Sequence, residues 1–194
     1  MSLDHVILGF VNECPRSGYD LKKSFDATVA HIWRAKQSQI YLTLARLKKS
    51  GLVDLQVVRQ DDKPNRKVYH ITADGLRELR RWLAEAIPPP DVRDAFLVQM
   101  TWADAITGDE IVGLLDAFTA ARRQRLEEYH GFQLSLAGGP PRGKWSAVLI
   151  PLVVEQLVMA EETSLAWAAI ASERVKALLA TPAGEETTPD RSIR

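Results

Sequence analysis

The chain has a single cysteine, no long apolar run and no net charge, and the first two of these shortages each exclude a kind of protein. Cys14 is alone among 194 residues, which excludes an intrachain disulfide and a cysteine zinc cluster. The longest run without Asp, Glu, Lys or Arg has 13 residues, Tyr129 to Pro141. A membrane-spanning helix needs roughly 20 apolar residues. Since the N-terminus also lacks the pattern of a signal peptide, we expect a soluble, cytoplasmic protein with no membrane partner.

The zero net charge hides a difference between the two halves of the chain. Residues 1–87 contain 15 Lys and Arg against 10 Asp and Glu, whereas residues 88–194 contain 10 against 15. A basic half joined to an acidic half is the pattern expected when only the first faces a polyanion. A chance imbalance between two solvated surfaces explains the same counts. The positions of the charges in the fold must therefore decide.

Three consecutive prolines, Pro88 to Pro90, divide the chain. They remove three N–H donors and disfavour helix in the residue before them, so a helix should end near Ile87. We expect one domain over residues 1–87 and a second over residues 91–179. Residues 180–194 carry little apolar surface and are predicted to form a disordered tail.

The hydrophobic period changes along the first domain. It is helical over residues 3–10, 20–25 and 37–50, and Gly51 closes the third helix. It then becomes two over residues 53–57 and 68–72, which predicts two strands around a polar turn at 61–66. A fourth helix begins at Thr72 and carries Leu76, Leu79 and Leu83. This order is that of a winged helix-turn-helix, in which the third helix enters the DNA major groove.

The second domain is predicted to be entirely helical, so the fold class is mainly α. Val92, Phe96, Met100 and Ala103 share one face of its first helix. Thr107 and Glu110 form a capping box for a helix that reaches about Leu136. A last helix over residues 148–179 is apolar around much of its surface. Long helices with wide apolar faces usually bury them against another chain, which favours a homodimer over packing within one chain.

The third helix has an outward face suited to DNA. When Ile40, Leu44 and Leu47 point inward, small and hydrogen-bonding side chains lie outward near its start and cations lie further along. Such residues suit base edges and phosphates, respectively. Lysines at a helix C-terminus also favour the helix dipole without any DNA. The outward residues are Ser38, Leu42, Ala45, Arg46 and Lys49, flanked by Tyr41 and Lys48.

Several spaced motifs resemble the PadR-like family of bacterial transcriptional regulators. They are Gly18-Tyr19-Asp20-Leu21, then Ser38-Gln39-Ile40-Tyr41 with Gly51-Leu52-Val53, and the wing Pro64-Asn65-Arg66-Lys67-Val68-Tyr69. The resemblance covers about residues 3–87 and, more loosely, residues 91–179. It implies a dimeric repressor that binds inverted-repeat (palindromic) operators in double-stranded DNA and often responds to a small molecule.

The same resemblance implies roles for individual residues. Ser38, Gln39 and Tyr41 would contact bases, while Tyr19, Lys22 and Lys23 would hold phosphates. Many relatives have Pro where this chain has Leu42, which would either touch a thymine methyl or change the base readout. The candidate DNA-binding surface comprises Ser38, Gln39, Tyr41, Leu42, Arg46 and Lys49 of the third helix, Tyr19, Lys22 and Lys23 of the second, and Lys63, Arg66 and Lys67 of the wing.

No motif predicts catalysis, a cofactor or a metal site. Gly138 to Lys144 matches G-x-x-x-x-G-K, but Trp145 replaces the Ser or Thr that holds magnesium. The four histidines show no metal-ligand spacing. Cys14 is interpreted as a small buried or half-buried residue rather than a redox sensor.

Two tryptophans are candidates for an effector pocket. Trp102 and Trp167 lie on separate helices of the second domain and would stack on a small hydrophobic or aromatic effector, although aromatic residues more often simply pack. An alternative function also remains: a winged-helix module that binds the acidic surface of a partner protein without sequence-specific DNA binding.

Overall fold

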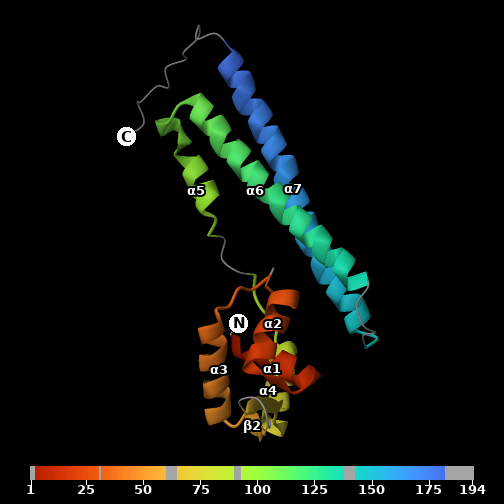
Figure 1. The fold of residues 1–194 in the computed structure, drawn as a ribbon. Coiled ribbons are helices and arrows are strands. Elements are labelled where there is room, and N and C mark those ends of the chain that lie inside the picture. The colour runs from red at the N-terminus through yellow and green to blue at the C-terminus, as the bar shows by residue number, and fades with distance from the viewer. Residues whose placement is uncertain (1–2, 31, 60–64, 90–92, 138–142, 182–194) are drawn as a thin grey trace. The chain divides into compact units, whose positions relative to one another are not determined.

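The computed structural model describes residues 3–30, 32–59, 65–89, 93–137 and 143–181 (Figure 1). The chain forms two compact units, Met1–Asp91 and Val92–Arg194. The predicted wing residue Lys63 and the predicted tail from residue 182 onward lie outside the described residues. The elements of the first unit are α1 (Leu3–Glu13), β1 (Arg16–Ser17), α2 (Gly18–Thr28), α3 (Gln37–Lys49), β2 (Val53–Val58), β3 (Arg66–Ile71) and α4 (Ala73–Leu83).

The first unit is a winged helix, as predicted, with one additional strand. Its antiparallel sheet has the order β1-β3-β2, with Val53 opposite Ile71 and Val58 opposite Arg66. The two-residue strand β1 places Arg16 opposite Tyr69. Two residues are too few to show a hydrophobic period, so β1 could not be predicted from the sequence.

Among the element boundaries that differ from the prediction, two differ because side chains cap the helices. Helix α2 begins at Gly18 rather than Asp20, since Ser17 and Asp20 form a capping box in which the Asp20 N–H donates to Ser17 Oγ at 3.2 Å. Strand β3 ends at Ile71 rather than Thr72. Thr72 instead caps α4, its Oγ1 accepting from the Gly75 N–H at 3.0 Å.

The core of the first unit lies around α1, which packs against α2, α3, α4 and β3. The buried side chains of this core are Ile7, Leu8, Phe10, Val11, Leu21, Phe25, Ile40, Leu44, Leu47, Val53, Tyr69 and Leu79. Tyr69 is therefore a core aromatic residue, as its position in a strand indicated. Leu83, the last of the three leucines predicted on the fourth helix, is 66% exposed, because α4 ends there, one turn beyond Leu79 in the core.

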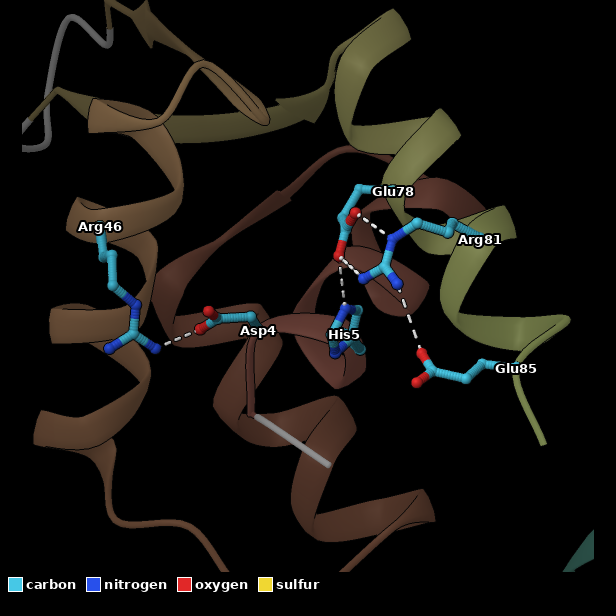
Figure 2. A network of polar contacts seen from close by, with 6 residues as sticks. All are labelled: Asp4, His5, Arg46, Glu78, Arg81 and Glu85. Atoms are coloured by element: carbon cyan, nitrogen blue, oxygen red, sulfur yellow. Dashed lines mark hydrogen bonds and ion pairs between the residues drawn. The ribbon is translucent and has the colours of Figure 1, made fainter. Parts of the chain in front are cut away.

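Polar side chains of α1 connect it to α3 and α4 (Figure 2). Asp4 forms an ion pair with Arg46 of α3. His5 Nε2 lies 3.0 Å from Glu78 Oε1 of α4, and the His5 ring stacks on Trp82 with their centroids 4.8 Å apart. Hydrogen bonds from Arg81, and then from His5, lower the pKa of Glu78 to about 2, so this carboxylate is ionised at neutral pH.

The turn after α3 is set by a glycine and packs closely on the start of α4. Gly51 has φ +71°, a left-handed conformation that favours glycine. The Gly51 and Leu52 N–H groups donate to the Lys48 and Leu47 carbonyls at 3.0 and 2.9 Å, which forms a Schellman motif. The Thr72 N–H donates to the Leu52 carbonyl, and a Cβ on Gly75 would lie 2.1 Å from the same oxygen. The close approach therefore requires glycine at position 75.

The second unit consists of helices, as predicted. Its elements are α5 (Ala95–Thr101), the 3-10 helix η1 (Ala103–Ala105), α6 (Gly108–Ala137) and α7 (Ser146–Ala180). The predicted capping box is confirmed: the Thr107 N–H donates to Glu110 Oε2 at 2.8 Å, and the Glu110 N–H donates to Thr107 Oγ1 at 3.3 Å. Among the described residues, no helix is both long and apolar enough to cross a membrane.

Helices α6 and α7 lie side by side (Figure 1). A charge cluster around one buried carboxylate joins them. The Glu161 side chain of α7 is 5% exposed. Its carboxylate lies 3.2 Å from Arg122 Nη1 and 3.4 Å from Arg125 Nη1 on α6. A buried carboxylate needs such partners because its own desolvation is costly. This cluster therefore ties the register of α7 to that of α6.

Gly75→Ala should destabilise the first unit, because the new methyl group would overlap the Leu52 carbonyl. We expect the free energy of unfolding to fall by about 1–3 kcal/mol, measured by urea denaturation of the full chain. Gly9→Ala is the matched control, since an added methyl group there would meet no atom within 4 Å beyond the backbone of its own helix, α1. The control should gain up to about 1 kcal/mol from helix propensity. Equal stability of the two variants would contradict the close approach at Gly75.

Candidate nucleic-acid interface

Helix α3 presents the predicted residues outward. Ile40, Leu44 and Leu47 are at most 1% exposed, and Thr43 is also buried. Leu42, which replaces the family's proline, is 71% exposed. The exposed residues of this face include Ser38, Gln39, Tyr41, Leu42, Ala45, Arg46, Lys48 and Lys49. The helix can therefore approach a partner with this whole face without disturbing the core.

Two residues near the start of α3 are oriented by their contacts, one within the helix cap and one with α2. Gln39 Oε1 accepts from the Lys36 N–H at 2.8 Å, so the amide oxygen caps the helix. The Tyr41 ring lies against Gly18 at the start of α2, where a Cβ would come within 2.4 Å of Tyr41 Cε1. Gly18 thus leaves the space that the ring occupies. Residues so far apart share no sequence pattern that could have revealed this contact.

The wing residues lie beside the start of α2. Arg66 and Lys67 begin β3, and both are exposed. Arg66 pairs with Asp20, the residue that also closes the capping box with Ser17. Hydrogen bonds from Ser17 and then from Arg66 hold the pKa of Asp20 below its ordinary value. The pairing of Ser17 with Val68 in the sheet places the wing next to α2, and the ion pair with Arg66 keeps the Asp20 carboxylate ionised.

The start of α2 thus lies between α3 and the wing. Gly18 contacts Tyr41 of α3, and Asp20 contacts Arg66 of the wing. Tyr19, between them, is 68% exposed. Lys22 forms an ion pair with Asp26 on the same helix, and Lys23 is exposed. The structure therefore brings the described residues of all three elements of the candidate DNA-binding surface together.

The sequence did not single out Arg16 as a neighbour of the candidate DNA-binding surface. Arg16 lies at a cleft of ≈ 300 Å³ that is also lined by Cys14, Lys23 and Arg66. Arg16 Nη1 donates to Ser24 Oγ at 2.6 Å, and its Nε donates to the Phe10 carbonyl at 3.3 Å. It thereby connects the end of α1 to α2.

The interpretation of Cys14 as buried or half-buried is wrong: the residue is exposed, because it follows the last residue of α1.

The two tryptophans of the second unit lie in different surroundings. Trp167 packs edge-on against Phe96 and Phe118, with ring centroids 6.1 and 5.8 Å apart, and these two phenylalanines stack on each other at 4.2 Å. The Arg122 guanidinium lies 4.7 Å from the centre of the Phe118 ring. Trp102 is 66% exposed. Trp167 therefore belongs to an aromatic cluster that carries a cation at its edge.

The described residues contain no group of three His, Cys, Asp or Glu side chains that could hold a metal ion. Exposed hydrogen-bonding side chains on α3, a wing beside it and cations on both are the features of a surface that meets DNA. Fold and surface together define the class of winged-helix DNA-binding proteins.

Comparison with known proteins identifies the family. Residues 7–81 match the transcriptional regulator PadR-like family, and residues 92–176 match the family described as virulence activator alpha C-term. The chain is 32% identical to the probable transcriptional regulator Rv1176c of Mycobacterium tuberculosis over 178 residues, 86% of this chain and 94% of the relative. It is 29% identical to the negative transcriptional regulator PadR of Bacillus subtilis, over 72% of this chain and 78% of the relative.

Solved structures agree with this result. Bacillus subtilis PadR in complex with operator DNA matches with a TM-score of 0.78 at 25% identity, covering 89% of this chain and 98% of that one. The same protein in complex with p-coumaric acid matches with a TM-score of 0.76 at 25% identity, covering 90% and 95%. The chain belongs to the PadR-like family and is a transcriptional regulator of the PadR type.

Proposed function

We propose that this regulator is a homodimeric repressor that binds an inverted-repeat operator. Two copies of α3 enter successive major grooves, about 34 Å apart, and the bound dimer obstructs a promoter. The observation that carries the proposal is that α3 exposes one face while Ile40, Leu44 and Leu47 on its opposite face are buried. Bacillus subtilis PadR, which is named as a negative transcriptional regulator and was crystallised with operator DNA, supports the same function.

The two ends of α3 have different tasks in this proposal. Ser38, Gln39 and Tyr41, with Leu42 beside them, face base edges, and Leu42 offers an apolar contact to a thymine methyl. Arg46 and Lys49 lie further along the helix and contact phosphates. The remaining contacts to the DNA backbone come from Tyr19, Lys22 and Lys23 of α2 and from Lys63, Arg66 and Lys67 of the wing.

Tyr41→Ala and Arg66→Ala should therefore weaken DNA binding in different ways. Tyr41→Ala should lower operator affinity by about tenfold or more while changing affinity for a scrambled duplex little, because base contacts carry the sequence information. Arg66→Ala should weaken both complexes and reduce the salt slope by about 1.8, because it removes a phosphate contact from each of the two protomers. Fluorescence anisotropy with a duplex from the intergenic DNA beside the gene measures both effects.

Arg77→Ala is the control for the loss of a positive charge, since Arg77 lies on α4 and pairs with Asp74. Thermal unfolding of each variant separates misfolding from lost contacts, which matters for Tyr41 because its ring covers Gly18. Full operator affinity in Tyr41→Ala would contradict the base contact.

Absence of DNA binding by the wild type, with salt-tolerant binding to a partner protein, would favour the interaction-module alternative.

The apolar surface of α7 supports the homodimer. The helix buries Val154 and Ala168 within its own unit. On other sides it exposes Leu149, Leu152, Met159 and Ile170, each between 51% and 58% exposed. Several of these residues are three or seven positions apart, as on the seam of a helix that packs against another. Such a stripe is costly to leave in water, so we infer that a second copy covers it.

A charge placed within this stripe should separate the protomers. Leu152→Glu is expected to lower the molar mass in solution from twice 21.7 kDa to 21.7 kDa, because the carboxylate would be desolvated at the interface. Sedimentation equilibrium measures the mass. Ile32→Glu is the control, since Ile32 is 51% exposed in the first unit. A wild-type protein that is monomeric at micromolar concentration would overturn the homodimer.

We also infer that a small hydrophobic or aromatic effector releases the DNA. The aromatic cluster of Phe96, Phe118 and Trp167, with Arg122 at its edge, offers ring contacts and a positive charge. The structure of Bacillus subtilis PadR with p-coumaric acid supports a ligand of this chemistry. Trp102 is a second candidate contact.

Titration with p-coumaric acid and related phenolic acids should quench tryptophan fluorescence to saturation and dissociate the operator complex. Trp167→Phe should reduce the quenching more than Trp102→Phe, because Trp167 lies in the cluster and Trp102 is 66% exposed. Trp33→Phe is the control in the first unit. Unchanged operator binding across the panel would contradict an effector of this class.

A further inference from the structure

Three cations of the candidate DNA-binding surface are paired with carboxylates in the free protein. Arg46 of α3 pairs with Asp4 of α1, Arg66 of the wing pairs with Asp20 of α2, and Lys22 pairs with Asp26 on α2. Figure 2 shows the first of these, with the Arg46 guanidinium extended from α3 toward the Asp4 carboxylate. Each phosphate-binding element thus carries a cation that already has an anionic partner.

These pairs contribute little to folding. The Arg46 and Arg66 side chains are 60% and 49% exposed, and exposed ion pairs stabilise a protein only weakly because water screens them. We expect the pairs to affect DNA binding more than folding, since a phosphate that approaches the cation must either displace the carboxylate or share the cation with it. In both cases a carboxylate remains near the polyanionic DNA backbone, and this holds for a duplex of any sequence.

We propose that Asp4 and Asp26 lower the affinity of this protein for duplex DNA of any sequence, by holding Arg46 and Lys22 in the free state. This inference rests on the proposed function. Binding then depends more heavily on the base contacts of Ser38, Gln39 and Tyr41, because the phosphate contacts alone are made weak. Asp20 belongs to the same set, but its capping box with Ser17 also supports α2, so its substitution would not separate the two roles.

Asp4→Asn is the test, and Asp74→Asn is its matched control. Both carboxylates lie in the first turn of a helix and pair with an arginine, Asp4 with Arg46 and Asp74 with Arg77. Both substitutions change the net charge equally, but Arg77 belongs to α4 and not to the candidate DNA-binding surface. The probe is a scrambled duplex of about 30 base pairs, roughly three turns of DNA, so its affinity can be measured by anisotropy at several salt concentrations without knowledge of the operator.

Asp4→Asn should bind the scrambled duplex about fivefold more tightly than Asp74→Asn at low salt. Its salt slope should be steeper by about 1.8, the share of one additional phosphate contact in each of the two protomers. Asp26→Asn should show the same gain. In an Arg46→Gln background, Asp4→Asn should gain no more than Asp74→Asn, because the cation that Asp4 holds is absent.

Equal affinities of Asp4→Asn and Asp74→Asn would overturn the inference, and so would weaker binding by Asp4→Asn, which would mean that Asp4 presents Arg46 to DNA. If these results came with salt-dependent duplex binding by the wild type, the proposed function would stand and only this inference would fail. A wild-type protein that binds no duplex at low salt would remove both. Unchanged melting temperatures of the two variants exclude a folding defect as the cause.

Discussion

Burial of one side of α3 against α1 and α2 is the constraint on which the candidate DNA-binding surface depends. Because Ile40, Thr43, Leu44 and Leu47 are removed from water, the opposite side of the helix must face outward. The Schellman turn at Gly51 and the close packing on Gly75 hold its C-terminal end. The orientation of the outward residues therefore follows from the core and not from contacts among themselves.

The start of α2 assembles the surface from parts that are distant in sequence. Gly18 leaves space for the Tyr41 ring, and Asp20 holds both its own helix cap and Arg66 of the wing. In the proposed complex, a protein with zero net charge presents the cations of this candidate surface to DNA. Asp4, Asp20 and Asp26 pair with three of these cations, and in the proposal above they weaken the electrostatic contribution and leave the base contacts to discriminate between sequences.

The second unit combines a well-defined interior with an exposed apolar stripe. Glu161 is satisfied by Arg122 and Arg125 between α6 and α7, so the register of these helices is specified by buried charge as well as by apolar packing. Phe118 and Trp167 bring aromatic rings from the same two helices together. The outward stripe of α7 has no such partner among the described residues of its own unit, which accounts for the need for a second copy in the proposed dimer.

Sequence alone determined the order of helices and strands, the inward stripe of α3, the Gly51 turn and the Thr107 capping box, because each depends on residues within a few positions of one another. It did not reveal the strand at Arg16, the exposure of Cys14 and Leu83, or the pairing of Arg46 and Arg66 with acidic residues of other elements. Those features arise where separate elements meet. Hydrophobic periodicity records which side of an element is buried, whereas only the tertiary structure decides which side chain of another element lies opposite.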